Sequence, residues 1–96
     1  MAEQQIQIQI DEQTSKGAYA NLAVLSHSEN EFVVDFVFIH PPLGKVVSRI
    51  ITSPSHAKML MKALAENISQ YEKKFGVIPE PKQPPPPAMG IQISKN

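Results

Sequence analysis

The carboxyl group with the most unusual setting is that of Asp35, which interrupts the apolar run Glu31–Ile39 (EFVVDFVFI). A carboxylate among apolar side chains needs a partner, or its pKa must shift. Arg49 is the only arginine, and it lies in the β-branched segment Lys45–Thr52, which can pair with the apolar run. We therefore predict a structural ion pair that fixes orientation at a covered surface. An acid/base site formed by Asp35, Arg49 and Tyr19 is the alternative, and it indicates no substrate.

The other reactive side chains form no recognisable site. His27, His40 and His56 do not have the spacing of metal ligands, there is no cysteine, and the four glycines are isolated. Ser53 and Ser55 lie near His56 at a helix start, which favours capping over catalysis. We expect no catalytic residue, no metal, no cofactor and no enzymatic activity.

Composition and charge argue against several classes of partner. Nine Lys and Arg residues balance nine Asp and Glu residues, and the lysines are scattered, whereas nucleic-acid-binding proteins usually carry a basic stripe. The N-terminal sequence MAEQQIQIQI does not resemble a signal peptide, and no segment has the ~20 apolar residues that span a bilayer. We expect a cytoplasmic protein that binds neither nucleic acid nor membrane.

Apolar alternation and turn residues predict an antiparallel meander of four strands. The expected strands cover about residues 4–10, 18–26, 31–39 and 45–52. In the proposed register Asp35 lies opposite Arg49 on one side and Ala23 on the other, and Phe38 lies opposite Val46. One sheet face is then rich in phenylalanine, and the other contains the ion pair. The expected phenylalanine-rich face comprises Leu22, Val24, Phe32, Val34, Phe36, Phe38, Val46 and Ile50.

A long helix follows the last strand. Ser53 is a suitable N-cap, Pro54 suits the first helical position, and Gly76 is a typical C-terminal stop. The helix, at about residues 54–75, is predicted to lie across the phenylalanine-rich face. Its apolar stripe comprises Ala57, Leu60, Met61, Leu64, Ile68, Tyr71 and Phe75. The predicted fold is a single α+β domain (residues 1–76) with one long C-terminal helix packed on a four-stranded antiparallel sheet.

A Pro-rich tail, residues 77–96, follows this domain. Six of the nine prolines lie between Val77 and Pro87, which predicts an extended segment without a core. Two interpretations of the end of the tail remain: it frays, or Ile91 and Ile93 add a strand to an open sheet edge.

The second sheet face is also apolar, and the chain has no second helix to cover it. A large exposed apolar patch is unusual for a monomer, so we predict a homo-oligomer, either a dimer or a dimer of dimers. The predicted interface comprises Val33, Asp35, Val37, Ile39, Val47, Arg49 and Ile51.

Short motifs between about Gly17 and Ile78 resemble a known family. They are Tyr19-Ala20-Asn21, Glu31-Phe32, Asp35-Phe36, Ser48-Arg49, Ser53-Pro54, Ala57-Lys58 and Tyr71-Glu72. Together they resemble the small bacterial and archaeal domain-of-unknown-function family 3467, a resemblance that implies no assigned activity. The order of a meander and then a helix is also similar, in topology alone, to SecB-type export chaperones, which are tetramers that hold unfolded chains.

These observations predict a non-enzymatic, oligomeric protein-binding or scaffold module. A SecB-like holdase for unfolded chains is one alternative, and a small enzyme with a site near Asp35 and Arg49 is another.

Overall fold

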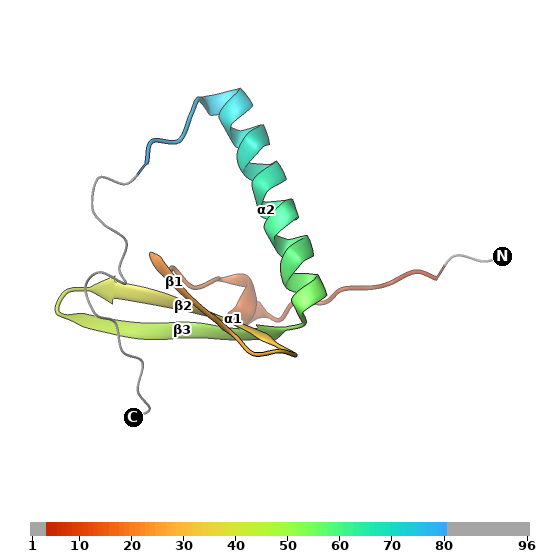
Figure 1. Ribbon diagram of the computed structural model, residues 1–96, viewed down its shortest axis with the longest axis horizontal. Coiled ribbons are helices and arrows are strands. Elements are labelled where there is room, and N and C mark those ends of the chain that lie inside the picture. The colour runs from red at the N-terminus through yellow and green to blue at the C-terminus, as the bar shows by residue number, and fades with distance from the viewer. Residues whose placement is uncertain (1–3, 81–96) are drawn as a thin grey trace.

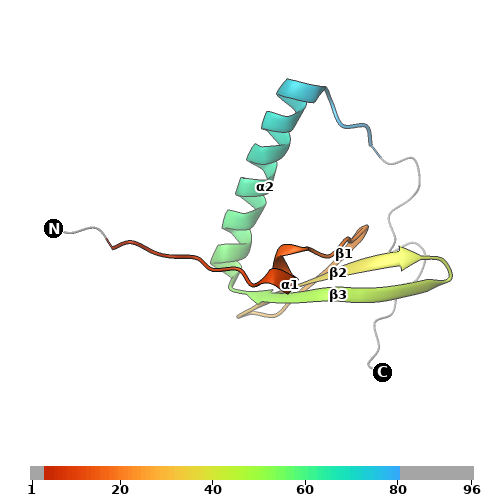
Figure 2. The same ribbon diagram turned by 180° about the vertical axis from the view of Figure 1, so that it is seen from behind.

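A computed structural model describes residues 4–80 of the chain. Its elements are α1 (Glu12–Ser15), β1 (Leu22–His27), β2 (Phe32–His40), β3 (Leu43–Thr52) and α2 (Pro54–Phe75). The strands form one antiparallel sheet in the order β1-β2-β3, and α2 rises from one end of it (Figure 1; seen from behind in Figure 2). The α+β class, the antiparallel sheet and the C-terminal helix are as predicted, but the described residues form three strands and not four.

The pairing of β2 with β3 follows the predicted register up to Phe36. Asp35 lies opposite Arg49, and Phe36 lies opposite Ser48. Beyond Phe36 the register shifts by one residue, so that Val37 pairs with Val46, and Val47 is the extra residue of a β-bulge. The predicted pairing of Phe38 with Val46 is therefore wrong.

The predicted register of β1 is wrong by one residue. Val24, and not Ala23, lies opposite Asp35. Because side chains alternate along a strand, this slip places Leu22 and Val24 on the face of Asp35, and Ala23 and Leu25 on the phenylalanine-rich face. The hairpin turn sets this register, since the Ser28 backbone N–H donates to the Glu31 carbonyl at 2.8 Å and His27 then pairs with Phe32.

The expected strand at residues 4–10 does not form. Ile6, Ile8 and Ile10 are exposed, and Ile8 retains 91% of its accessible surface. Alternation identifies the side of a segment that could be buried, but a strand also needs a neighbouring strand as its hydrogen-bonding partner. Residues 4–10 instead run as an extended segment into the short helix α1.

The helix α2 has the predicted bounds and the predicted caps. The Ser53 hydroxyl accepts a hydrogen bond from the His56 backbone N–H at 3.1 Å, and Pro54 is the first helical residue. Gly76, with φ of +98°, ends the helix, and its N–H donates to the Glu72 carbonyl at 2.9 Å.

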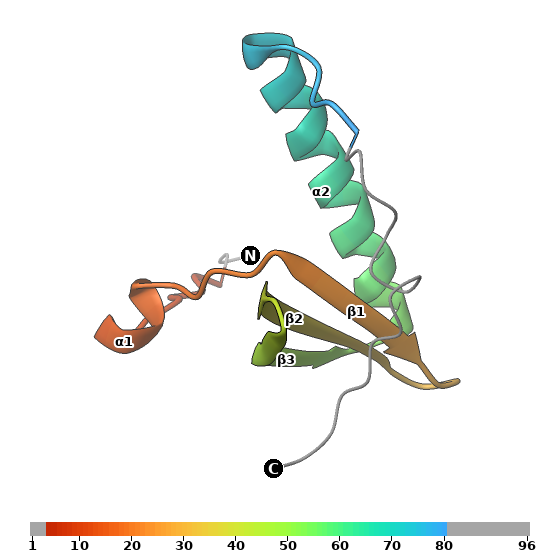
Figure 3. The same cartoon turned by 90° about the vertical axis from the view of Figure 1, so that its left-hand side faces the viewer.

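The predicted packing of α2 across the phenylalanine-rich face is wrong. The helix points away from the sheet, as the side view in Figure 3 shows, and its apolar stripe is largely exposed. Only Ser53 separates β3 from α2, and hydrogen bonds span this junction. Thr52 Oγ1 lies 2.7 Å from His56 Nδ1, and the Ala57 N–H donates to the Ser53 carbonyl at 2.9 Å. The Thr52–His56 bond, which joins β3 to the helix, favours the outward direction of α2.

The core of the described chain is very small. Among residues 4–80, Val34 and Val37 are the buried apolar side chains, and they lie on opposite faces of β2. The remainder of the predicted Pro-rich tail from residue 81 onward, including the proposed strand-adding residues Ile91 and Ile93, lies outside the described residues.

Candidate functional site

The ion pair between β2 and β3 forms as predicted. Arg49 Nε donates to Asp35 Oδ1 at 2.7 Å, and Arg49 Nη2 donates to Asp35 Oδ2 at 2.9 Å. Asp35 is 4% exposed, whereas the side chain of Arg49 is about half exposed. This bidentate arrangement satisfies both carboxylate oxygens and fixes the orientation of the two strands.

The same contact holds both groups in their charged forms. Hydrogen bonds from Arg49, helped by its positive charge, lower the pKa of Asp35 although burial opposes the shift. The hydrogen bonds with Asp35 raise the pKa of Arg49 in turn. The geometry therefore favours a structural role for this pair over proton transfer.

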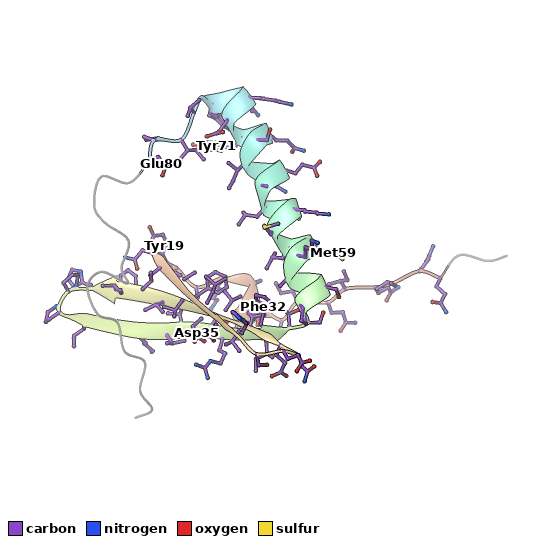
Figure 4. All side chains as sticks on the ribbon, in the orientation of Figure 1. Tyr19, Phe32, Asp35, Met59, Tyr71 and Glu80 are labelled. Atoms are coloured by element: carbon purple, nitrogen blue, oxygen red, sulfur yellow. The ribbon has the colours of Figure 1, made fainter. Side chains whose placement is uncertain are left out.

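Tyr19, the third residue of the alternative acid/base site, does not join the Asp35–Arg49 pair. Tyr19 packs edge-on against Phe38, with ring centroids 5.9 Å apart and an interplanar angle of 74°. Phe38 lies on the opposite sheet face from Asp35, and Figure 4 shows Tyr19, which precedes β1, away from Asp35 on β2. Tyr19 is thus positioned by aromatic packing and not by the ion pair.

Most of the predicted interface residues share one face. We define the Asp35 face as the side of the sheet that contains the ion pair; its members are Leu22, Val24, Val33, Asp35, Val37, Ile39, Val46, Arg49 and Ile51. Asp35 and Val37 are already buried there by neighbouring strands, whereas Ile51 is 57% exposed. The assignment of Val47 to this face is wrong, because the bulge brings Val46 into the position opposite Val37.

Val47 instead lies beside Phe36 and Ser48 on the other side of the sheet. These three residues line an open hollow of about 500 Å³. The facing wall comprises Gln13, Thr14, Gly17, Ala18 and Ala20, from α1 and the segment that follows it. The N-terminal segment thus flanks one part of the phenylalanine-rich face.

Sequence reasoning missed the role of Asn21. Its side-chain amide donates to the Ile39 carbonyl at 2.9 Å and accepts from the Ile39 N–H at 2.8 Å, while its own N–H donates to the Val37 carbonyl at 3.0 Å. The amide thereby extends the β1–β2 ladder by one further pair of hydrogen bonds. The Asn directly before β1 in the Tyr19-Ala20-Asn21 motif was the available signal.

The three histidines make different contacts. His27 stacks on Phe32 at a centroid distance of 5.3 Å, His56 contacts Thr52, and His40 ends β2. Within residues 4–80, no three His, Asp or Glu side chains gather in a way that could hold a metal ion. Neither helix of this part of the chain is long and apolar enough to cross a membrane.

Two further apolar surfaces remain exposed. We call the first, which is the phenylalanine-rich side of the sheet, the Phe face; its exposed members are Leu25, Phe36, Phe38 and Ile50. We call the second the α2 stripe; its members are Leu60, Met61, Leu64, Ile68, Tyr71 and Phe75. Each of these ten side chains keeps between about two fifths and two thirds of its surface in water, which is far more than residues of a packed core expose.

No curated protein and no solved structure matched the chain, so the similarity to SecB-type chaperones gains no support. A family model described as "Protein of unknown function (DUF3467)" matches residues 1–80. That match contains every motif on which the sequence resemblance rests. The chain therefore belongs to the DUF3467 family.

Proposed function

We propose that this protein is a non-enzymatic, oligomeric protein-binding or scaffold module of the cytoplasm, which assembles through the Asp35 face. One observation carries the proposal. Within residues 4–80 only two apolar side chains are buried, while large apolar side chains stay exposed on both sheet faces and along α2. Monomeric proteins rarely expose so much apolar surface, and association removes it from water.

The Asp35 face is suited to burial against a second chain. Ile51 is more than half exposed there, and Val33 and Ile39 are partly exposed. Both carboxylate oxygens of Asp35 are bonded to Arg49, so a partner can cover Asp35 without leaving an unpaired buried charge. A two-fold contact would bring these residues against their own copies.

Molar mass in solution tests this proposal. We expect the wild-type chain to be a dimer or a dimer of dimers by size-exclusion chromatography with light scattering. Ile51→Asp places a charge in the proposed contact and should weaken association at least ~10-fold, which corresponds to about 1.4 kcal/mol. Leu43→Asp is the matched control, because Leu43 is an exposed aliphatic residue of the same strand at the hairpin end. A wild-type monomer at every concentration, or equal masses for both variants, contradicts the proposal.

A SecB-like holdase is the second candidate, and the exposure of the Phe face and the α2 stripe favours it. A holdase keeps apolar surface open after assembly, so the oligomer should bind a hydrophobic dye and slow the aggregation of an unfolded client. An oligomer that binds no dye removes this candidate. The enzyme alternative is disfavoured by the bidentate pair, in which both oxygens of Asp35 are already engaged.

A further inference from the structure

The Phe face and the α2 stripe are two apolar surfaces that one chain holds apart. The stripe occupies one side of α2, and Figure 4 shows Tyr71 on the side that overlooks the sheet and Met59 on the opposite side. The Phe face is the side of β2 opposite Asp35. Each surface is of the kind that a sheet and a helix normally bury against one another.

The junction between β3 and α2 holds these surfaces apart within one chain. Ser53 is the single connecting residue, and its hydroxyl and carbonyl are both bonded into the first turn of α2. The bond between Thr52 Oγ1 and His56 Nδ1 ties the end of β3 to the same turn. Folding the helix back onto its own sheet would turn the chain at this junction and break the Thr52–His56 bond.

We propose that α2 of one chain lies across the Phe face of a second copy, and that α2 of the second copy lies across the Phe face of the first chain. The arrangement is a reciprocal exchange with two-fold symmetry. It depends on the proposed function only in that the chain self-associates, because it uses the sheet face opposite to the Asp35 face.

The dimensions of the two surfaces match. The stripe from Leu60 to Phe75 is about 23 Å long at 1.5 Å per residue. β2 has nine residues and extends about 30 Å, and three strands at about 4.8 Å spacing give a surface about as wide as one helix. The N-terminal segment that flanks Phe36 and Ser48 would form a wall beside the incoming helix.

The area available is that of a stable dimer. The six side chains of the stripe and the four of the Phe face keep about half of their surface exposed. For side chains of this size, that is on the order of 900 Å² in each chain, whereas a standard interface buries about 800 Å² on each partner. The exchange, which buries both surfaces of each chain, therefore provides an area comparable to that of a standard interface.

Cross-linking between different chains tests the exchange, because the native sequence has no cysteine. A Phe36→Cys chain is unfolded and refolded together with a ¹⁵N-labelled Leu64→Cys chain and treated with a short thiol-specific cross-linker. We expect a linked pair containing one labelled and one unlabelled chain, identified by mass spectrometry. Met59→Cys replaces Leu64→Cys in the control, since Met59 is similarly exposed, at 65% against 59%, but lies on the other side of α2. That control should yield at least ~5-fold less linked product if α2 docks through its stripe.

The outcomes separate this inference from the proposed function. If a Phe36→Cys/Leu64→Cys double variant links only within one chain, α2 covers its own sheet and the exchange is wrong. An oligomer that Ile51→Asp dissociates but that gives no link between chains also overturns the exchange, and leaves the proposed function standing. A linked dimer that persists with Ile51→Asp supports the exchange, and it counts against the Asp35 face if the variant and the wild type have the same molar mass. Circular dichroism of each variant serves as the control that the variant retains its fold.

Discussion

At the scale of single residues, the Asp35–Arg49 pair joins β2 to β3 through two side-chain hydrogen bonds. The guanidinium meets both carboxylate oxygens, and the carboxylate is buried among the apolar side chains of its face. Removing Arg49 alone would leave a buried, unpaired charge, which costs more stability than removing both partners together. We therefore expect the pair to stabilise the register of β2 against β3.

The lowered pKa of Asp35 predicts a specific loss of stability in acid. An unfolded Asp has a pKa of about 3.9. The folded chain holds this proton less tightly than the unfolded one, so the stabilisation is complete above that pH and is lost as the pH falls through the lower folded value. Thermal melts between about pH 2 and pH 7 should show the wild-type Tm falling below about pH 4.

Asp35→Asn is the control for this acid dependence. It should have a lower Tm than wild type at pH 7 but a smaller decrease below pH 4, because it lacks the titrating carboxyl group. Parallel curves for the two proteins would show that Asp35 does not contribute to the pH dependence.

At the scale of elements, the N-terminus of α2 depends on one cap. Ser53→Ala removes the hydroxyl that accepts from the His56 N–H and should reduce the free energy of unfolding by about 1 kcal/mol. Ser55→Ala is the matched control, because the Ser55 hydroxyl caps no backbone N–H among residues 4–80 and has Ser53 Oγ, at 3.4 Å, as its hydrogen-bond partner. Urea unfolding of both variants measures the difference, and equal midpoints would contradict the capping role.

The elements differ in how far the sequence could predict them. Both ends of α2 and the facing of Asp35 and Arg49 were predictable, because caps, helical periodicity and a lone opposite charge are local signals. The bulge was not predictable, since residues 46 and 47 are both valine and either could face Val37. The β1 register was not predictable either, because Leu22 and Val24 alternate with the equally apolar Ala23 and Leu25.

The partners that segments distant in sequence pack against were harder to predict than the elements themselves. The alternating isoleucines from Ile6 to Ile10 have the pattern of a strand, but no sequence signal names the partner that such a strand requires. Likewise, the apolar stripe of α2 shows that the helix needs a covered side without showing which chain provides the cover. The candidate interface was predictable as a face, and its one misplaced member, Val47, followed from the bulge.

At the scale of the whole molecule, residues 4–80 bury too few apolar side chains to form a complete hydrophobic core. Val34 and Val37 each begin a core, one on each face of β2, and neither core has a second layer within residues 4–80. Stable domains need two packed layers around a common core. Stability and association should therefore be coupled.

This coupling predicts that the Tm depends on protein concentration. If folding and assembly are linked, a ~100-fold dilution should lower the Tm of the wild-type chain by several degrees through mass action. Circular dichroism melts across that range measure the shift. The Ile51→Asp variant should show a smaller shift, and a wild-type Tm that does not change with dilution would show that one chain is stable alone.

The single-residue connection at Ser53 also makes α2 a lever. The helix is anchored at one end and is about 33 Å long, and hydrogen bonds at Thr52, Ser53 and His56 make its base follow the end of β3. A change of about 10° in the direction of β3 at Thr52 therefore displaces Phe75 by about 6 Å for a helix of this length. The position of the helix tip amplifies small changes in the twist of the sheet.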